Sequence, residues 1–306
     1  MIFFIINKGK KKKKIKPLPG STQSEILKLK ELSYTTLPED LDSALSDQYK
    51  NIETISAGGM GVIASAIDRK NERKVAIKTV LPELGSNQKA IALFYSECEA
   101  IKKMNHPNIV RVYAVGDNNG LYYYIMEYLE GINLDKKIMK EKKVSITETI
   151  RIGTQIARAL QHCHSNQIIH RDIKPSNIFI TTKDTAKIID FGIVKLFSGD
   201  TALKMNSTKI GTPEYAPPEQ LQGQPISGKS DVYALGVCMY QMLSGKMPFK
   251  NAGVMSRMFD KPRDIKEFRK DIPENLIEVI NTCLELDPTL RYTANELWTK
   301  LKAIKY

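Results

Sequence analysis

The chain has 306 residues, of which 42% are hydrophobic and 26% charged, a balance typical of a soluble globular protein. Its length allows one large domain or two small ones, with enough chain for a substantial core. No run of residues approaches the roughly 18–20 apolar positions that a membrane-spanning helix needs.

The net charge of +12 is concentrated in a leader at residues 1–20, which holds seven lysines and no acid. We interpret this leader as solvated and disordered. The alternative is contact with acidic lipid headgroups or nucleic acid. Its apolar residues precede its lysines, which is the reverse of a secretory signal.

The rest of the chain has no basic stripe interleaved with aromatic residues, so we expect no specific nucleic-acid partner. The four cysteines are widely spaced and form no C-x-x-C pair. This usage indicates neither a zinc site nor a disulfide framework, and we expect a cytoplasmic location.

Residues 21–48 are weakly helical and read as a linker or as an arm packed on the domain that follows. From Tyr49 the texture changes to short runs of branched residues separated by turns, which predicts antiparallel strands. A helix is expected between the third and fourth strands. The predicted elements of this sheet part are strands 49–55, 60–67 and 73–80, a helix at 89–104, and strands 109–116 and 121–126.

The predicted helix carries Glu97 on the same face as the apolar residues Leu93, Ile101 and Met104. An acid within an apolar stripe is costly unless it finds a cation or stays hydrated. Glu99 points about 200° away from that stripe and is expected to face water.

Beyond Glu127 the chain is mostly helical. Capping boxes are predicted at Ser145 and Thr293, and the apolar run 231–244 predicts a helix buried in the middle of a lobe. Strands first and helices later favour a two-lobed α+β domain with a cleft between the lobes. We place the small lobe at 49–126, a hinge at 127–131 and the large lobe at 132–306.

The residues that indicate chemistry lie in His170–Asn177, which reads HRDIKPSN, and in an Asp-Phe-Gly triplet that begins at Asp190. Asp172 can accept a proton and Lys174 supplies a positive charge. Asn177 and Asp190 offer an amide oxygen and a carboxylate that suit a magnesium ion. Phosphoryl transfer from a nucleotide requires this set of groups.

These two motifs resemble the catalytic loop and the metal-binding motif of eukaryotic-like (Hanks-type) serine/threonine protein kinases. The resemblance continues to the C-terminus, and the Gly-Gly-Met-Gly wording is closest to bacterial members. It implies the two-lobed kinase fold and transfer of the ATP γ-phosphoryl group to serine or threonine hydroxyls of protein substrates, with Mg²⁺ or Mn²⁺. Lys174, two residues after Asp172, implies serine/threonine rather than tyrosine specificity.

In the resemblance, Lys78 lies seventeen residues after Gly61 and grips the α- and β-phosphates, with Glu97 as its partner. The hinge backbone at Glu127 and Leu129 contacts adenine, with Met126 guarding the rear pocket. The family pattern has glycine at the position of Ser56, a departure that could reduce nucleotide affinity. The other implied nucleotide contacts are Ile55, Ala57, Gly58, Gly59, Met60, Gly61, Ile63 and Ala76.

The resemblance also implies an activation segment at 193–210, closed by residues 211–219. Thr212 would contact Asp172 and Lys174, and Glu219 would pair with Arg291. Arg171 beside the catalytic aspartate suggests control by phosphorylation, and we hypothesise autophosphorylation, with self-association of the chain. The candidate positions are Ser198, Thr201, Ser207 and Thr208, of which the last two are favoured.

Two other classes of function were weighed. A nucleotide-binding pseudokinase scaffold is supported only by Ser56 and by Pro217, which stands where the family has alanine. A small-molecule phosphotransferase would share the catalytic aspartate but would have no use for a peptide-docking segment.

Overall fold

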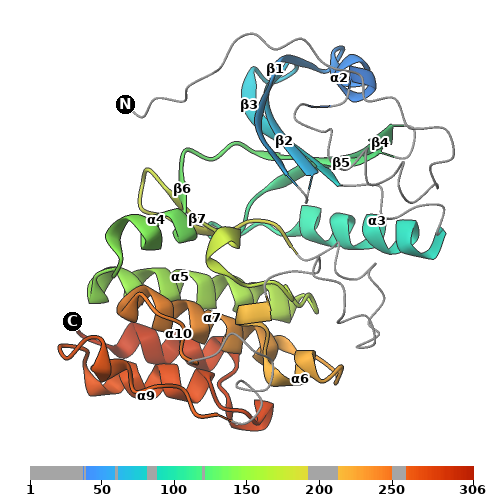
Figure 1. Ribbon diagram of the computed structural model, residues 1–306. Helices are drawn as coiled ribbons and strands as arrows, with labels where there is room; N and C mark the ends of the chain where they lie inside the picture. The colour runs from blue at the N-terminus through green and yellow to red at the C-terminus, as the bar shows by residue number, and fades with distance from the viewer. Residues whose placement is uncertain are drawn as a thin grey trace, which may run out of the picture.

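The computed structural model describes residues 37, 39–58, 61–80, 88–118, 121–191, 213–249 and 260–306. Figure 1 shows a small part built on a sheet and a larger, mainly helical part beneath it. Both parts of the predicted two-lobed α+β architecture are therefore present.

The small part is a five-stranded antiparallel sheet with the strand order β1-β2-β3-β5-β4. Helix α3 follows β3 and lies on the side of the sheet that faces the helical part (Figure 1). The predicted strands and helix are confirmed, with ends that agree or differ by at most three residues. Their bounds are β1 (Tyr49–Gly58), β2 (Gly61–Asp68), β3 (Arg73–Val80), α3 (Gln88–Lys103), β4 (Val112–Asn118) and β5 (Leu121–Glu127).

The outer face of the sheet is covered by helix α2 (Glu39–Leu45), which lies in the stretch that we read as a linker or arm. Leu41 and Leu45 are fully buried against an apolar cluster of strand residues that includes Val62, Val75 and Ile77. The described part of this stretch thus packs on the sheet, whereas the assignment of residues 21–48 as linker or arm stays a prediction. The domain start at Tyr49 stays a prediction.

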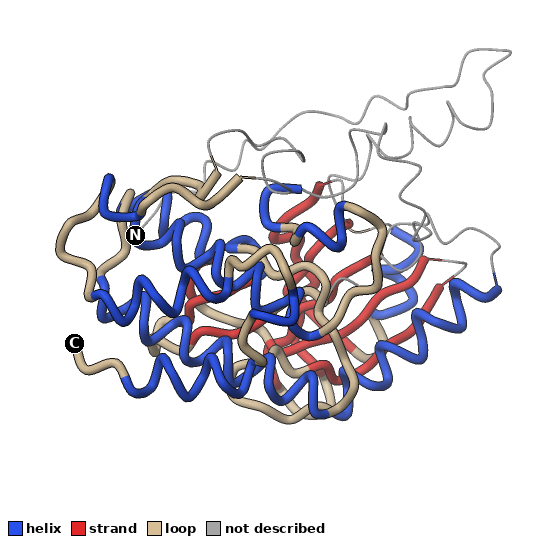
Figure 2. Tube along the Cα trace, turned by 90° about the horizontal axis from the view of Figure 1, so that it is seen from below, coloured by secondary structure: helices blue, strands red, loops and turns tan. Residues whose placement is uncertain are grey.

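The larger part is organised around helix α7 (Gly228–Ser244), of which 14 of 17 residues are buried. Helices α5 and α9 pack against it, and α10 packs mainly on α5 (Figure 1). Figure 2 shows the helices and strands from below. The expectation of a helix buried on nearly all sides is confirmed. The remaining elements are β6 (Gly131–Asn133), α4 (Leu134–Glu141), α5 (Ile146–Ser165), β7 (Ile178–Thr181), β8 (Ala186–Ile188), α6 (Pro218–Leu221), α9 (Glu274–Cys283) and α10 (Ala294–Ala303).

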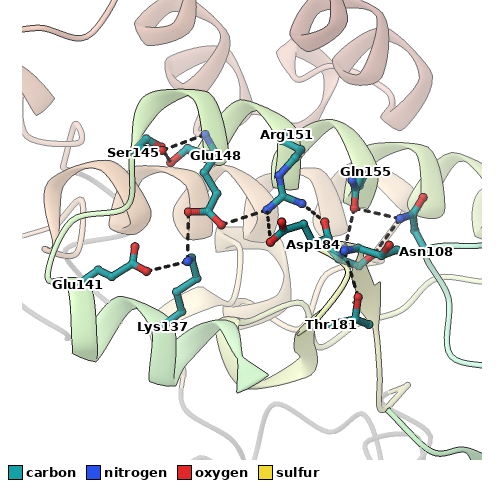
Figure 3. A network of polar contacts seen from close by, with 12 residues as sticks. Asn108, Lys137, Glu141, Ser145, Glu148, Arg151, Gln155, Thr181 and Asp184 are labelled. Carbon is teal, nitrogen blue, oxygen red and sulfur yellow. Dashed lines mark hydrogen bonds and ion pairs between the residues drawn. The ribbon is translucent and has the colours of Figure 1, made fainter. Parts of the chain in front are cut away.

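The two predicted capping boxes differ. Thr293 and Glu296 exchange both bonds at the start of α10, as expected. At the start of α5, Ser145 accepts a hydrogen bond from the Glu148 backbone N–H, but the return bond is missing. The prediction of a complete box there is wrong, because the Glu148 carboxylate turns instead to two cations, Lys137 at 3.1 Å and Arg151 at 3.0 Å (Figure 3).

The same face of α5 fixes the β7–β8 hairpin. The Gln155 side-chain oxygen accepts the Ala186 backbone N–H at 2.6 Å and an amide hydrogen of Asn108 at 3.2 Å (Figure 3). Asn108 also donates to the Ala186 carbonyl at 2.8 Å. Because Asn108 precedes β4, these bonds tie the sheet part to the hairpin that leads to Asp190.

The cysteines Cys98, Cys163, Cys238 and Cys283 are all buried and free, and burial raises the pKa of the Cys163 thiol to about 12. Among the described helices, none is both long enough and apolar enough to cross a bilayer.

The C-terminal half contains a buried ion pair between Glu219 and Arg291, as the resemblance implied. The guanidinium donates to both carboxylate oxygens, at 2.7 and 2.9 Å, and also to the backbone carbonyls of Glu285 and Leu286. Burial alone would raise the pKa of Glu219, but the hydrogen bonds and charge of Arg291 outweigh burial, and the pKa is lowered from 4.5.

We predict that Glu219→Gln lowers the free energy of unfolding by about 3 kcal/mol at pH 7, because it leaves a buried guanidinium without a counter-charge. A lowered carboxylate pKa adds stability above the unfolded value, and this stability is lost as the pH falls below 4.5 through the folded value. Urea unfolding at pH 7 and at a pH below the folded pKa of Glu219 should therefore give a smaller difference in unfolding free energy between variant and wild type at the lower pH. An equal difference at both pH values would contradict the prediction.

We predict that Leu41→Ala lowers the free energy of unfolding of the sheet part by about 2–3 kcal/mol, because Leu41 is fully buried under α2. The neighbouring residue Asp42 is exposed, so Asp42→Ala serves as the control and should change stability by less than about 0.5 kcal/mol. Denaturant unfolding of the two variants measures this. Equal stabilities would mean that α2 contributes nothing to the sheet.

Candidate active site

Asp172 lies in a short loop in which two neighbouring side chains converge on its carboxylate. Lys174 approaches the oxygen Oδ2 at 2.9 Å, and the amide of Asn177 donates to the same oxygen at 2.9 Å. Asn177 also donates to the Asp172 backbone carbonyl at 2.8 Å, because a 3₁₀ turn at Pro175–Asn177 folds the chain back. The structure thus brings together three predicted residues, of which Lys174 and Asn177 are buried.

The backbone of this loop is anchored by Asp231 near the start of α7. The Asp231 carboxylate is 1% exposed and accepts the backbone N–H groups of His170 and Arg171, each at 2.9 Å. His164 Nε2 lies 2.9 Å from the same carboxylate. Arg171 has a φ of +67°, a left-handed conformation that costs a residue with a side chain free energy. The bonds to Asp231 offset that cost.

Asp190 is brought beside this loop by the β7–β8 hairpin. The Ile189 backbone N–H donates to the Asn177 carbonyl at 2.9 Å, so the residue before Asp190 is bonded to the turn that holds Asp172. Asp190 also has a left-handed φ, of +65°. Its carboxylate forms an ion pair with Lys78 from strand β3. The two carboxylates and both lysines therefore belong to one site, where the sheet meets the helical part.

The donor atoms of this site suit a hard divalent cation. Asn177 uses its amide nitrogen for the bonds to Asp172, which leaves its amide oxygen as the atom available to a metal. Asp190 adds a carboxylate whose side chain is 28% exposed. Carboxylate and amide oxygens are ligands for magnesium or manganese, which usually take further oxygens from water and phosphate.

The predicted phosphate loop is the turn between β1 and β2, where Gly58 pairs with Gly61. Gly61 has a φ of +119°, and a β-carbon there would collide with the Thr79 backbone carbonyl. Only glycine fits this position. Ile55, Ser56 and Ala57 lie exposed along the end of β1, whereas Gly59 and Met60 lie outside the described residues.

The sheet presents other predicted nucleotide contacts on the face that carries Lys78. Ile63 is the cross-strand partner of Lys78, and Ala76 lies two residues earlier on the same strand. Ala76 in turn faces Met126, the predicted guard of the rear pocket. Because cross-strand partners share a face, these side chains form one surface above the site of Asp190.

The hinge residue Glu127 has a role that sequence reasoning did not assign. We expected a contact with adenine through the backbone of Glu127 and Leu129. The Glu127 carboxylate also accepts the Arg111 backbone N–H at 2.8 Å and pairs with Lys187 of β8 at 2.6 Å. This side chain therefore links the two lobes behind the hinge. Leu129 is partly buried against the main core.

Some predicted residues cannot be placed. The side chain of Glu97 on α3 lies outside the described part of the chain. The same holds for Thr212 and for the candidate phosphorylation positions, which are Ser198, Thr201, Ser207 and Thr208. The pairing of Lys78 with Glu97 therefore stays a prediction. Glu99 is exposed and pairs with Lys102 at 3.2 Å, which confirms that it faces water.

Sequence reasoning missed three residues of the site: Asp231, Lys187 and Tyr124. Sequence analysis treats Asp231 only as the first residue of the apolar run 231–244, although an acid at the start of an apolar helix is a pattern that indicates a buried anchor. Lys187 and Tyr124 contribute through contacts with residues distant in the sequence, and no local pattern marks them.

The protein kinase domain family matches residues 49–301. This chain belongs to that family. The kinase domain is 36% identical over 270 residues to a probable serine/threonine-protein kinase of Clostridium acetobutylicum, covering 87% of this chain and 41% of the relative. It is 34% identical over 263 residues to the serine/threonine-protein kinase PrkC of Bacillus subtilis, covering 84% of this chain and 40% of the relative. The chain thus spans about two fifths of the length of these relatives.

Solved structures share the fold of this kinase domain. A crystal structure of Rad53 residues 1–466 in complex with AMP-PNP superposes with a TM-score of 0.69 at 27% identity, covering 83% of this chain and 65% of the crystallised one. The kinase domain of PknI from Mycobacterium tuberculosis gives a TM-score of 0.68 at 22% identity, covering 83% of this chain and 96% of that kinase-domain chain. The family uses ATP and a divalent metal in general.

We predict that Asp231→Asn lowers the free energy of unfolding by about 2 kcal/mol and speeds amide exchange at His170 and Arg171 by about 30-fold. The asparagine amide would place an NH₂ group, which is itself a donor, opposite one of the two backbone N–H groups, so that one hydrogen bond made by the carboxylate would be lost. Urea unfolding and hydrogen exchange measure the two effects. Asp184→Asn is the control, because Asp184 is an 81% exposed turn residue whose positive φ asparagine tolerates. Unchanged exchange in Asp231→Asn would show that the anchor is dispensable.

Proposed function

We propose that this kinase domain transfers the γ-phosphoryl group of ATP to serine and threonine hydroxyls of protein substrates, with Mg²⁺ or Mn²⁺ as the divalent ion. The observation that carries the proposal is the convergence of Lys174 and Asn177 on the Asp172 carboxylate, beside Asp190 and Lys78. Relatives named serine/threonine-protein kinases at 34–36% identity support the same specificity.

Each residue has a distinct part in the proposed reaction. Asp172 accepts or orients the proton of the attacking hydroxyl, and Lys174 stands opposite the negative charge that develops on the transferred group. Asn177 and Asp190 hold the divalent ion, and Lys78 grips the α- and β-phosphates. Because little covalent chemistry falls to the protein, the contributions are orientation and electrostatic stabilisation.

Lys174 and Asn177 both approach one oxygen of the Asp172 carboxylate, Oδ2, and together they fix the orientation of this carboxylate. The ion pair also keeps the buried Lys174 charge compensated before nucleotide binds.

We further propose that the domain phosphorylates its own activation segment through self-association, and that it acts in the cytoplasm. Arg171, directly before Asp172, is suited to receive a phosphate carried by Ser207 or Thr208. Four free, buried cysteines are consistent with a reducing compartment. A contact of the lysine-rich leader with a membrane surface is a weaker alternative.

We predict that Asp172→Ala lowers the transfer of labelled phosphate from ATP to a generic substrate such as myelin basic protein by at least about 100-fold, because the proton acceptor is lost. Binding of a non-hydrolysable ATP analogue should change less than about threefold, since Asp172 faces the hydroxyl rather than the nucleotide. Equal transfer by the variant and the wild type would reject catalysis by this site. Tight analogue binding without transfer by the wild type would favour the pseudokinase alternative.

A further inference from the structure

Tyr124 of strand β5 lies directly opposite Lys78 of β3 in the sheet register. Cross-strand partners project from the same face of a sheet, so both side chains point toward the interface between the lobes. Both are buried, Lys78 at 8% exposure and Tyr124 at 6%. A buried phenol on this face needs a hydrogen-bond partner, because its hydroxyl has lost water.

The partner of the Tyr124 hydroxyl is Asp190, whose oxygen Oδ1 accepts the bond at 3.2 Å. Lys78 forms its ion pair with the same oxygen. One oxygen of the Asp190 carboxylate is therefore held from the sheet by two donors. The other oxygen, Oδ2, is the atom left to bind a metal ion.

The surroundings make the phenol difficult to replace. A small cavity beside it is lined mainly by apolar residues, among them Ile101, Val110, Val112 and Phe191. Such a lining offers a water molecule too few partners to take over the bond if the hydroxyl is lost.

Asp190 also depends on its neighbours for its orientation. Its left-handed backbone is unfavourable by itself, and the ring of the next residue, Phe191, packs with its centroid 4.8 Å from that of His170. Hydrogen bonds to a ligating carboxylate set its orientation, and their loss typically costs 10- to 100-fold in metal affinity.

We propose that Tyr124 is a positioning residue for the metal site: its hydroxyl fixes the Asp190 carboxylate in the orientation that binds the divalent ion. This inference rests on the proposed function, because it takes Asp190 as a metal ligand. It adds a residue of the sheet to the metal site, and it makes metal affinity depend on how β5 sits above Asp190.

The test is Tyr124→Phe, which removes the hydroxyl and keeps the ring. Binding of Mn²⁺ to the intact chain, saturated with a non-hydrolysable ATP analogue, is measured by electron paramagnetic resonance. We expect Mn²⁺ affinity to fall about tenfold. Tyr123→Phe is the matched control, since Tyr123 projects from the opposite face and packs on the cluster under α2. It should bind Mn²⁺ like the wild type.

Two further readouts separate positioning from a general structural defect. First, the unfolding midpoints of Tyr124→Phe and Tyr123→Phe should agree. Second, the metal concentration that gives half-maximal phosphoryl transfer should rise about tenfold in Tyr124→Phe, whereas kcat at saturating metal should change less than twofold. Wild-type Mn²⁺ affinity in Tyr124→Phe would overturn the inference. So would a loss of kcat at saturating metal with no change in metal affinity.

A third variant distinguishes failure of the inference from failure of the proposed function. Asp190→Asn should abolish the analogue-dependent Mn²⁺ site in the wild-type background. If Asp190→Asn binds Mn²⁺ as well as the wild type, Asp190 is not a metal ligand, and the proposed function and the inference are both overturned. If Asp190→Asn loses the site and Tyr124→Phe keeps it, only the inference fails.

Discussion

The catalytic loop depends on one buried carboxylate. The Asp231 carboxylate accepts hydrogen bonds from two consecutive backbone N–H groups, those of His170 and Arg171, and lies beside the imidazole of His164. Arg171 has a left-handed backbone conformation that it would otherwise avoid. An unpaired charge at that depth would destabilise the helical part, so the loop and the anchor stabilise each other. The position of Asp172 follows from this arrangement, because Asp172 comes directly after the two residues whose N–H groups are anchored.

The two lobes share one buried apolar core, and a few polar contacts also join them. Lys78 and Tyr124 reach Asp190, Glu127 reaches Lys187, and Asn108 reaches the β7–β8 hairpin. Each contact depends on distance and direction, and the contacts of Lys78 and Tyr124 are made to Asp190 itself. A shift of one lobe against the other would therefore alter the geometry around the metal and the phosphates together.

The sequence predicted the features that depend on residues close together in the chain. Short runs of branched residues located all five strands, and a continuous apolar run located the buried helix α7. The contiguous catalytic motif brought Asp172, Lys174 and Asn177 into contact. It did not predict the partners that come from distant strands. Nothing in the run of tyrosines at 122–124 distinguishes the one whose hydroxyl reaches Asp190, because that choice follows from strand register. The incomplete cap at Ser145 likewise reflects cations brought in by folding.

The leucines of α2 bear on how this kinase domain can be isolated. The family match begins at Tyr49, after α2 has ended. A recombinant protein that begins at Tyr49 would expose to water the apolar face of the sheet that Leu41 and Leu45 cover. Patches of that kind promote precipitation and adventitious dimers. Trimming the leader while retaining Leu37 onward should yield the better-behaved sample.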